Sequence, residues 1–422
     1  MSPKTGKDSD GYHHEHVKCA ERVDVLVVGA GMVGLAFASA LKDSGLKVTL
    51  IERGEPAVFE SLGMDCRVSA IVLGNQQILQ GLGAWKHLQA DAGAMHSMRI
   101  WDDQHPGGIR FDADEISEGD TNYAALGYLV QNSHLQAALK KTLLPHDNVE
   151  ILCPTTIRTV EWLSEHVQIT LQDGHRLIAP LIVGADGAHS WLREQADIGV
   201  YSRDYNQSGI VANVRSMMPH HGTAFQRFTA SGPLAMLPMG NGLCSIVWSQ
   251  FSDDVERLMA LDDIGFLEEL NLTFGPMLGR IEEVGKRAAF PLKARLAIHL
   301  VRPRLALIGD AAHTIHPLAG LGVNLGLRDA MVLAQEIVDA KKYGEDWGDM
   351  SVLNRYMKLR MPDILSVMGS MEGLHRIFTS QLPGLPMLRG LGMKALGNAS
   401  IIKSLLMRNS TGLTLPVPKQ VG

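Results

Sequence analysis

Two short and almost uninterrupted apolar runs, Val23–Val28 and Val48–Ile51, stand near the start of the chain. Between them lie a glycine-rich turn and a stretch of small apolar residues at helical spacing, Met32–Leu41, which residues 43–45 (Asp-Ser-Gly) bring to an end. Continuous apolar runs of this length are typical of strands that are buried on both faces. The pattern therefore predicts a β-α-β unit.

The remaining pattern changes along the chain. Residues 148–186 predict short strands that close on a buried strand at Leu181–Val183. Residues 207–295 also have a strand-like pattern, and residues 305–308 predict one more central strand. From Asn324 onward the pattern is largely helical. Cofactor-type segments thus flank a β-rich block.

We therefore expect an α/β protein with a discontinuous, Rossmann-like cofactor domain built on a mostly parallel sheet. A β-rich substrate domain and a C-terminal helical region complete it. The expected boundaries are 1–21 for a disordered tail, 22–95, 127–198 and 298–345 for the cofactor domain, 96–126 and 199–297 for the substrate domain, and 346–422 for the helical region.

A G-x-G-x-x-G motif, formed by Gly29, Gly31 and Gly34, follows the first predicted strand and opens the predicted helix. In such motifs the first glycine permits the tight turn, the second admits a pyrophosphate, and the third lets helix and strand pack closely. Glu52 ends the second strand, where it can accept hydrogen bonds from a ribose. This combination predicts a dinucleotide site.

Two later strands end in the same way. Asp186 lies in "VGADGAHSWLR" (183–193), and Gly309 and Asp310 lie in "IGDAAHTIHP" (308–317). Ligands of such sheets bind at the carboxyl ends of the strands. Three such ends predict one extended ligand, because an ADP half needs only the first of them. A ribityl chain and a flavin ring would occupy the others, which favours FAD over NAD.

These three stretches resemble the fingerprints of class A FAD-dependent aromatic-ring hydroxylases. Within that class, "HPLAGLGVNLGLRD" (316–329) is very similar to the signature of the ubiquinone-biosynthesis hydroxylases. Further similar stretches are "CRVSAI" (66–71), "YLVQNSHLQAAL" (128–139) and "GTAFQRFTASGPLAMLP" (222–238). The resemblance covers roughly residues 22–410.

The resemblance implies a monooxygenase with FAD as cofactor, O2 as co-substrate and NAD(P)H as reductant. A flavin C4a-hydroperoxide would hydroxylate a polyprenylated phenol or benzoquinol on the way to ubiquinone. The chain has no second G-x-G-x-x-G, so NAD(P)H would bind without a Rossmann domain of its own. Because the flavin carries the chemistry, no protein acid or base is expected.

The resemblance also implies roles for single residues. Asp310 would bind the ribityl hydroxyls, Arg67 and Gln131 would lie near the cofactor, and Asp186 would support the dinucleotide fold and NAD(P)H. The flavin-lining positions would be His316, Pro317, Gly320, Gly322, Val323 and Asn324. Backbone N–H groups of residues 320–324 would point at the N1/C2 side of the ring, where reduced flavin is negative. Leu321 stands where this family usually has Gln.

Several of these residues have other interpretations. His313 and His316 could form a metal pair or an acid–base pair, but no third ligand is near in the sequence, and a structural loop beside the flavin is favoured; we expect no metal site. Arg67 could be an ordinary surface arginine, and Gln131 could cap a helix.

Charge and cysteine content set further bounds. The net charge of −6 gives no case for nucleic acid, and the four scattered cysteines favour a reducing cytoplasm. No apolar stretch reaches the ~18 residues of a transmembrane helix. After Glu372 the chain has no acidic residue and six basic ones, Arg376, Arg389, Lys394, Lys403, Arg408 and Lys419. This region predicts either peripheral contact with the inner membrane surface or with partner enzymes, or a helical cap on the protein itself.

Other functions stay open at this stage. The same scaffold could hydroxylate a small soluble phenol or reduce a prenyl chain. A different class of function is a flavoprotein that holds a quinone-biosynthesis assembly together.

Overall fold

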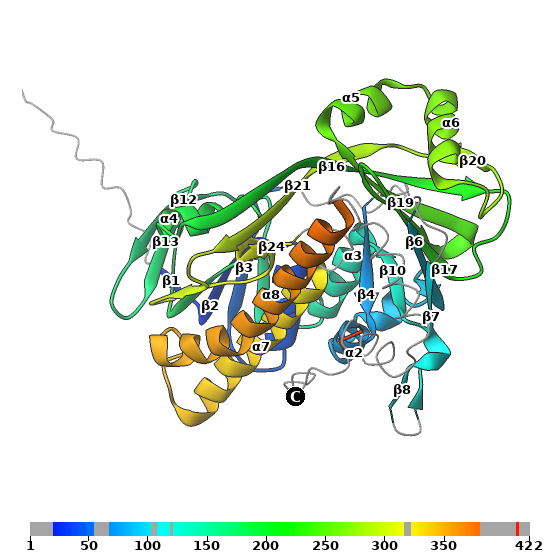
Figure 1. The fold of residues 1–422 in the computed structure, drawn as a ribbon. Coiled ribbons are helices and arrows are strands. Elements are labelled where there is room, and N and C mark those ends of the chain that lie inside the picture. The colour runs from blue at the N-terminus through cyan, green and yellow to red at the C-terminus, as the bar shows by residue number, and fades with distance from the viewer. Residues whose placement is uncertain are drawn as a thin grey trace, which may run out of the picture.

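The computed structural model describes residues 20–54, 67–102, 108–118, 121–315, 322–379 and 411–412 (Figure 1). The expected α/β architecture is confirmed. Glu21, which the sequence analysis assigned to the tail, already lies in a short strand, β1 (Glu21–Arg22), which pairs with β14 (Arg176–Ala179).

A six-stranded sheet forms the centre of the cofactor domain. Its strands, in spatial order, are β11 (Val149–Leu152), β3 (Val48–Ile51), β2 (Val25–Val28), β15 (Leu181–Gly184), β23 (Leu305–Leu307) and β22 (Val301–Arg302). All neighbours run parallel except β22 and β23. Every residue of β2, β3, β15 and β23 is buried, as their continuous apolar sequences predict.

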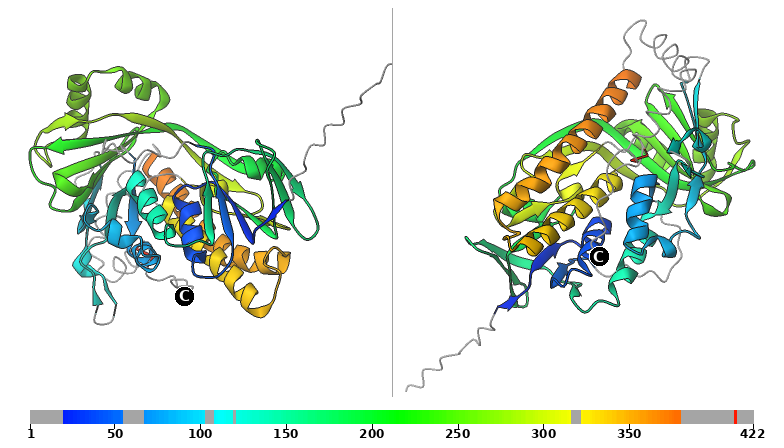
Figure 2. Two further views of the ribbon diagram at one scale, coloured as in Figure 1. Left: turned by 180° about the vertical axis from the view of Figure 1, so that it is seen from behind. Right: turned by 90° about the horizontal axis from the view of Figure 1, so that it is seen from below.

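Helices cover this sheet. They are α1 (Met32–Leu41), α3 (Asn132–Leu143), α7 (Gly322–Tyr343) and α8 (Met350–Thr379). The helices α1 and α7 lie side by side, as Figure 2 shows from below. Gly326 allows this close approach, because a Cβ atom there would lie 2.6 Å from Cγ2 of Val33. No helix in the described part of the chain is long and apolar enough to cross a membrane.

A nine-stranded sheet forms the second domain. Its strands, in spatial order, are β24 (His313–Thr314), β21 (Ala288–Ala297), β16 (Val200–Ser216), β19 (Leu243–Phe251), β18 (Gly232–Pro238), β17 (Thr223–Thr229), β6 (Ser97–Asp102) and β7 (Gly108–Asp112), with β20 (Ile281–Val284) beside β16. Two helices, α5 (Ser252–Ala260) and α6 (Asp263–Phe274), cover one face, which we call the helix face (Figure 1). The opposite face, the inner face, lies toward the cofactor domain (Figure 1).

The helices α5 and α6 correct the prediction that residues 207–295 are strand-like. α6 begins after Asp262, whose carboxylate accepts a hydrogen bond from the Gly265 N–H at 2.8 Å. It then buries Phe266, Leu270 and Phe274. Their four-residue spacing is the helical signal that the strand prediction overlooked.

Smaller elements complete the fold. A three-stranded sheet contains β4 (Val68–Val72), β10 (Gly127–Gln131) and β5 (Gly93–Met95), and β12 (Ile157–Trp162) and β13 (Val167–Leu171) complete the sheet of β1 and β14. The strands β8 (Ser117–Glu118) and β9 (Thr121–Asn122) form a pair. Two further helices are α2 (Leu73–Gly81) and α4 (Trp191–Gln195). Thr411 and Gly412 return to the cofactor domain. There the Gly74 N–H donates to the Thr411 carbonyl at 3.0 Å, and Arg328 donates to the Gly412 carbonyl at 2.7 Å.

Candidate cofactor site

Two of the three predicted motif glycines are required by the fold itself. Gly29 has φ +102°, and a Cβ atom there would lie 2.4 Å from the Ala185 carbonyl oxygen. A Cβ atom at Gly34 would lie 2.1 Å from the Gly29 oxygen. Gly31 differs, because its added Cβ meets nothing within 4 Å. The protein thus leaves space at Gly31, where the motif predicts the pyrophosphate.

Glu52 holds the same loop at its other side. One carboxylate oxygen accepts a hydrogen bond from the Ala30 N–H at 2.8 Å, and the other accepts one from the Gly54 N–H at 2.8 Å. A carboxylate has about four acceptor positions, so further ones remain for ribose hydroxyls. The side chain of Gln136, on α3, donates to the Ala30 carbonyl at 2.8 Å and so holds the loop from a second helix.

Asp186 lies at the second strand end, directly after β15. One oxygen accepts a hydrogen bond from the Leu192 N–H at 3.0 Å, at the start of α4. The other oxygen is buried and has no hydrogen-bond partner among the residues that the structure describes. A buried acceptor without a partner is costly, so a bound ligand or water would stabilise it.

Arg193, which the sequence analysis did not single out, joins the second and third strand ends. Its guanidinium is buried and donates to the Ala311 carbonyl at 2.8 Å and to the Ala188 carbonyl at 3.1 Å. Burial lowers the pKa of Arg193, and the charge of Asp186 partly opposes that shift. The contact with Ala311 spans 118 residues of sequence, which no local pattern reveals.

Asp310 lies at the third strand end, in the turn formed by Gly309–Ala311. Its side chain is open to solvent, yet burial by the surrounding protein raises the pKa of its carboxyl group. A side chain that is both open to solvent and surrounded by protein faces a recess of the molecule. Gly309 makes this turn possible with φ +59°, and its backbone packs against Val33 of α1.

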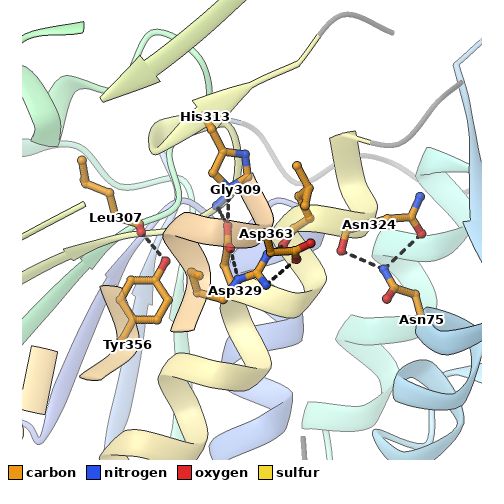
Figure 3. Close-up of polar contacts among 10 residues, drawn as sticks. Asn75, Leu307, Gly309, His313, Asn324, Asp329, Tyr356 and Asp363 are labelled. Carbon is orange, nitrogen blue, oxygen red and sulfur yellow. Dashed lines mark hydrogen bonds and ion pairs between the residues drawn. The ribbon is translucent and has the colours of Figure 1, made fainter. Parts of the chain in front are cut away.

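Asp329, on α7, fixes this third loop from below (Figure 3). One of its oxygens accepts hydrogen bonds from His313 Nε2 at 2.6 Å and from the Gly309 N–H at 3.0 Å. The other accepts one from Arg360 Nε, on α8, at 2.7 Å. Burial alone would raise the pKa of Asp329, but the charges of His313 and Arg360 and their hydrogen bonds outweigh it and lower that pKa to about 2.

His313 is therefore part of a structural network and pairs with a carboxylate inside the protein. It is almost fully buried and lies in β24, which pairs with β21. Within the described residues there is no group of three potential metal ligands. The Arg360 guanidinium also binds Asp363 at 2.6 Å, so two carboxylates surround one buried cation (Figure 3).

Asn324 connects the start of α7 to the sheet of β4. Its side-chain oxygen accepts a hydrogen bond from the Val72 N–H at 3.1 Å, and its amide donates to the Ala70 carbonyl at 2.6 Å. Asn75 donates to both oxygens of Asn324, as Figure 3 shows. The Asn324 side chain is thus occupied by hydrogen bonds within the protein. The prediction that Asn324 contacts the cofactor therefore applies to its backbone N–H.

The other predicted residues lie around the same region. Gly322 begins α7, and a Cβ atom there would meet nothing within 4 Å; Val323 is the next residue and is half-buried. Gln131 occupies the N-cap position of α3 but makes no side-chain cap hydrogen bond. Arg67 is exposed beside β4. His316, Pro317, Gly320 and Leu321 lie outside the described residues.

The arrangement fits FAD. The open backbone at Gly31, the acceptors of Glu52, the buried oxygen of Asp186 and the recess at Asp310 follow one another along adjacent strand ends, since β3, β2, β15 and β23 are neighbours. Such an extended row suits a dinucleotide in which a long ribityl and flavin half follows the ADP half. Fold and site together define a dinucleotide-binding oxidoreductase of the FAD type.

The comparison with known families gives the same class. Residues 22–368 match the FAD-binding domain family, and the chain belongs to that family. It is 36% identical over 389 residues to the ubiquinone hydroxylase UbiL of Rhodospirillum rubrum, and the aligned region covers 92% of this chain and 89% of that protein. It is also 36% identical over 396 residues to the 3-demethoxyubiquinol 3-hydroxylase of Escherichia coli, with 92% of this chain and 98% of that protein covered.

A solved structure has the same fold. The p-nitrophenol 4-monooxygenase PnpA from Pseudomonas putida superposes with a TM-score of 0.77 and covers 95% of this chain and 100% of its own, at 20% sequence identity. The sequence-based prediction of a FAD-dependent monooxygenase is confirmed.

Replacing Asp310 by Ala should weaken FAD binding by about 10- to 150-fold, since a hydrogen bond to a charged group contributes about 1.5–3 kcal/mol. Titration of the apoprotein with FAD, followed by flavin fluorescence, measures the affinity. Asp310→Asn keeps the shape and one acceptor and should lie between wild type and Asp310→Ala. Wild-type affinity in both variants would show that Asp310 does not contact the cofactor.

Proposed function

We propose that this protein hydroxylates the aromatic ring of a polyprenylated phenol or benzoquinol in ubiquinone biosynthesis, with O2 and NAD(P)H as co-substrates. The observation that carries this proposal is the 36% identity, over 92% of the chain, to the 3-demethoxyubiquinol 3-hydroxylase of Escherichia coli. The second such relative, from Rhodospirillum rubrum, also bears the name of a ubiquinone hydroxylase.

When bound, FAD supplies the redox and oxygen chemistry, which no side chain can perform. The chain's own residues would bind and orient it: Gly31 and Glu52 would hold the ADP half, and Asp310 would hold the ribityl chain. The first turn of α7 begins at Gly322, and the partial positive charge of its backbone N–H groups would stabilise negative charge on the ring.

Oxygen-18 labelling tests this function. The holoenzyme is supplied with NAD(P)H, ¹⁸O2 and a prenylated methoxyphenol or quinol, and the product is analysed by mass spectrometry. One ¹⁸O atom in the ring supports hydroxylation, whereas a reduced prenyl chain without label indicates a reductase. Faster labelling of an unprenylated phenol would instead indicate a soluble substrate.

A genetic experiment tests whether the protein acts in ubiquinone biosynthesis and whether it acts there as an enzyme or only as a scaffold. Deletion of the gene should make a ring-unhydroxylated quinone precursor accumulate, and its structure would identify the ring carbon. Complementation by an Asp310→Ala protein of normal abundance would favour a scaffold role over catalysis.

We also propose that the basic region after Glu372 brings the enzyme to an anionic membrane surface, where a prenylated substrate resides. Its charge supports this, since each basic residue near an anionic surface contributes about 1 kcal/mol. The test keeps the chain length, because Thr411 and Gly412 pack on the cofactor domain. Glutamine at Arg389, Lys394, Lys403, Arg408 and Lys419 should reduce cosedimentation with anionic vesicles; unchanged cosedimentation would contradict the proposal.

A further inference from the structure

The two faces of the nine-stranded sheet are packed differently. On the helix face, Ile210 and Ala212 of β16 are fully buried. On the inner face, Val211, Leu237 and Val247 are only half-buried, although they lie on the central strands β16, β18 and β19. Half-buried apolar residues in the middle of a sheet that faces another domain indicate a recess between the two.

Gln226 lies on this inner face. The preceding residue, Phe225, contacts Phe274 of α6 with 6.0 Å between ring centroids, and the following residue, Arg227, donates a hydrogen bond to the Thr273 carbonyl. Both neighbours therefore point to the helix face. Because successive side chains of a strand point to opposite faces, Gln226 points toward the cofactor domain.

The strand-register neighbours of Gln226 are apolar. Its partners in the strand register are Ala235 on β18 and Ile100 on β6, and the row continues from Ala235 to Val247 and then to Val211. Gln226 itself is only 7% exposed.

Its amide makes no hydrogen bond to any other residue that the structure describes, while Gln207, also buried in this sheet, donates to the Ser231 carbonyl at 2.6 Å. Its oxygen and nitrogen are not among the buried side-chain atoms without a partner in the described residues, so they are accessible from the recess. A ligand in the recess can therefore replace water as their hydrogen-bond partner.

We propose that Gln226 binds an oxygen substituent of the substrate's aromatic ring, while the ring lies against the half-buried side chains of Val211, Leu237 and Val247 on the inner face. An amide both donates and accepts, so it can bind a hydroxyl, methoxy or carbonyl oxygen. This assignment rests on the proposed function insofar as the substrate is an oxygen-bearing ring. It gives Gln226 a role in specificity: rings without an oxygen at this position leave the amide unpaired and bind more weakly.

The experiment uses two probes that differ in one hydroxyl group, 2-prenylphenol and prenylbenzene. Their binding to the oxidised holoenzyme is followed by the change in flavin absorbance. Wild type should bind 2-prenylphenol about 3- to 10-fold more tightly, as expected for one hydrogen bond. In Gln226→Leu this preference should disappear, while FAD content stays at the wild-type level.

Gln250→Leu is the matched control. Gln250 is 6% exposed and lies in the same sheet, but it follows Trp248 by two residues and so shares its orientation toward the helix face. This variant should keep the wild-type preference. Gln226→Met serves as a second variant of similar length if Gln226→Leu fails to fold.

An unchanged preference in Gln226→Leu and Gln226→Met, an equal loss in Gln250→Leu, or a wild type that does not distinguish the probes would each overturn the assignment. Failure of the proposed function looks different: no ¹⁸O would enter any ring product, whatever residue stands at position 226. Turnover adds a readout that a merely structural role would not change, because Gln226→Leu should raise KM for the phenol and the share of NAD(P)H lost to hydrogen peroxide.

Discussion

Replacing Arg360 by Met should lower the free energy of unfolding by about 3–5 kcal/mol, the usual cost of removing one partner of a buried ion pair. Arg360 is 4% exposed and binds Asp329, whose side chain is completely buried, at 2.7 Å. Met fills a similar volume, so the loss reflects the uncompensated carboxylate more than a cavity. Urea unfolding at pH 7, monitored by circular dichroism, measures the change.

Arg355→Met is the control for this substitution. Arg355 lies on the same helix and binds two carboxylates, Glu336 at 2.7 Å and Glu345 at 2.6 Å, but 38% of its side chain is exposed. Exposed ion pairs contribute about 0–1 kcal/mol, so this variant should unfold almost like wild type. Equal losses in the two variants would contradict the view that burial makes the Asp329 network essential.

The same network predicts an acid-sensitive part of the stability. The pKa of Asp329 is about 2 in the folded protein and 3.8 without the surrounding structure. A carboxyl group whose pKa is lowered by folding stabilises the fold above its unfolded pKa and loses this contribution as the pH falls toward its folded pKa. The stability difference between wild type and Arg360→Met, measured by urea unfolding at a series of pH values, should therefore shrink as the pH falls toward ~2, where Asp329 becomes protonated in wild type as well.

The local parts of the fold were predictable from the sequence. α1 and β3 have the predicted bounds, Met32–Leu41 and Val48–Ile51, because a strand buried on both faces and a helix of small residues leave direct traces in the apolar pattern. The strand ends were predictable for the same reason, since Gly29, Glu52, Asp186 and Asp310 each closely follow an apolar run. Their meeting at adjacent strands follows from the parallel order of the sheet.

The contacts that fix the third strand end and the start of α7 could not be predicted in this way. Asp329 and Arg360 are 31 residues apart, and Asn324 and Ala70 are 254 residues apart. No spacing rule indicates that such residues meet, because their contact depends on how α7 and α8 pack. One signal was present: "LRDA" (327–330) places two charged residues within an apolar helical stretch, which is typical of buried pairs.

The motif glycines allow the fold and the cofactor site to be tested separately. Gly34→Ala should destabilise the protein even without FAD, because its Cβ would lie 2.1 Å from the backbone oxygen of Gly29 and neither backbone segment can yield cheaply. Overpacking of this kind costs about 1–3 kcal/mol. Loss of FAD in this variant would therefore not identify a cofactor contact.

Gly31→Ala should instead leave the apoprotein intact and prevent FAD binding. Its added Cβ meets nothing within 4 Å, and its φ of −72° suits any residue, so the apoprotein's free energy of unfolding should change by less than about 1 kcal/mol. The methyl group would, however, occupy the space in which the backbone must approach a pyrophosphate. We expect FAD affinity to fall by 100-fold or more, as judged by titration of the apoprotein. If Gly31→Ala bound FAD like wild type, the pyrophosphate would not lie on the first turn of α1, and the order of the ligand along the strand ends would have to be reversed or shifted.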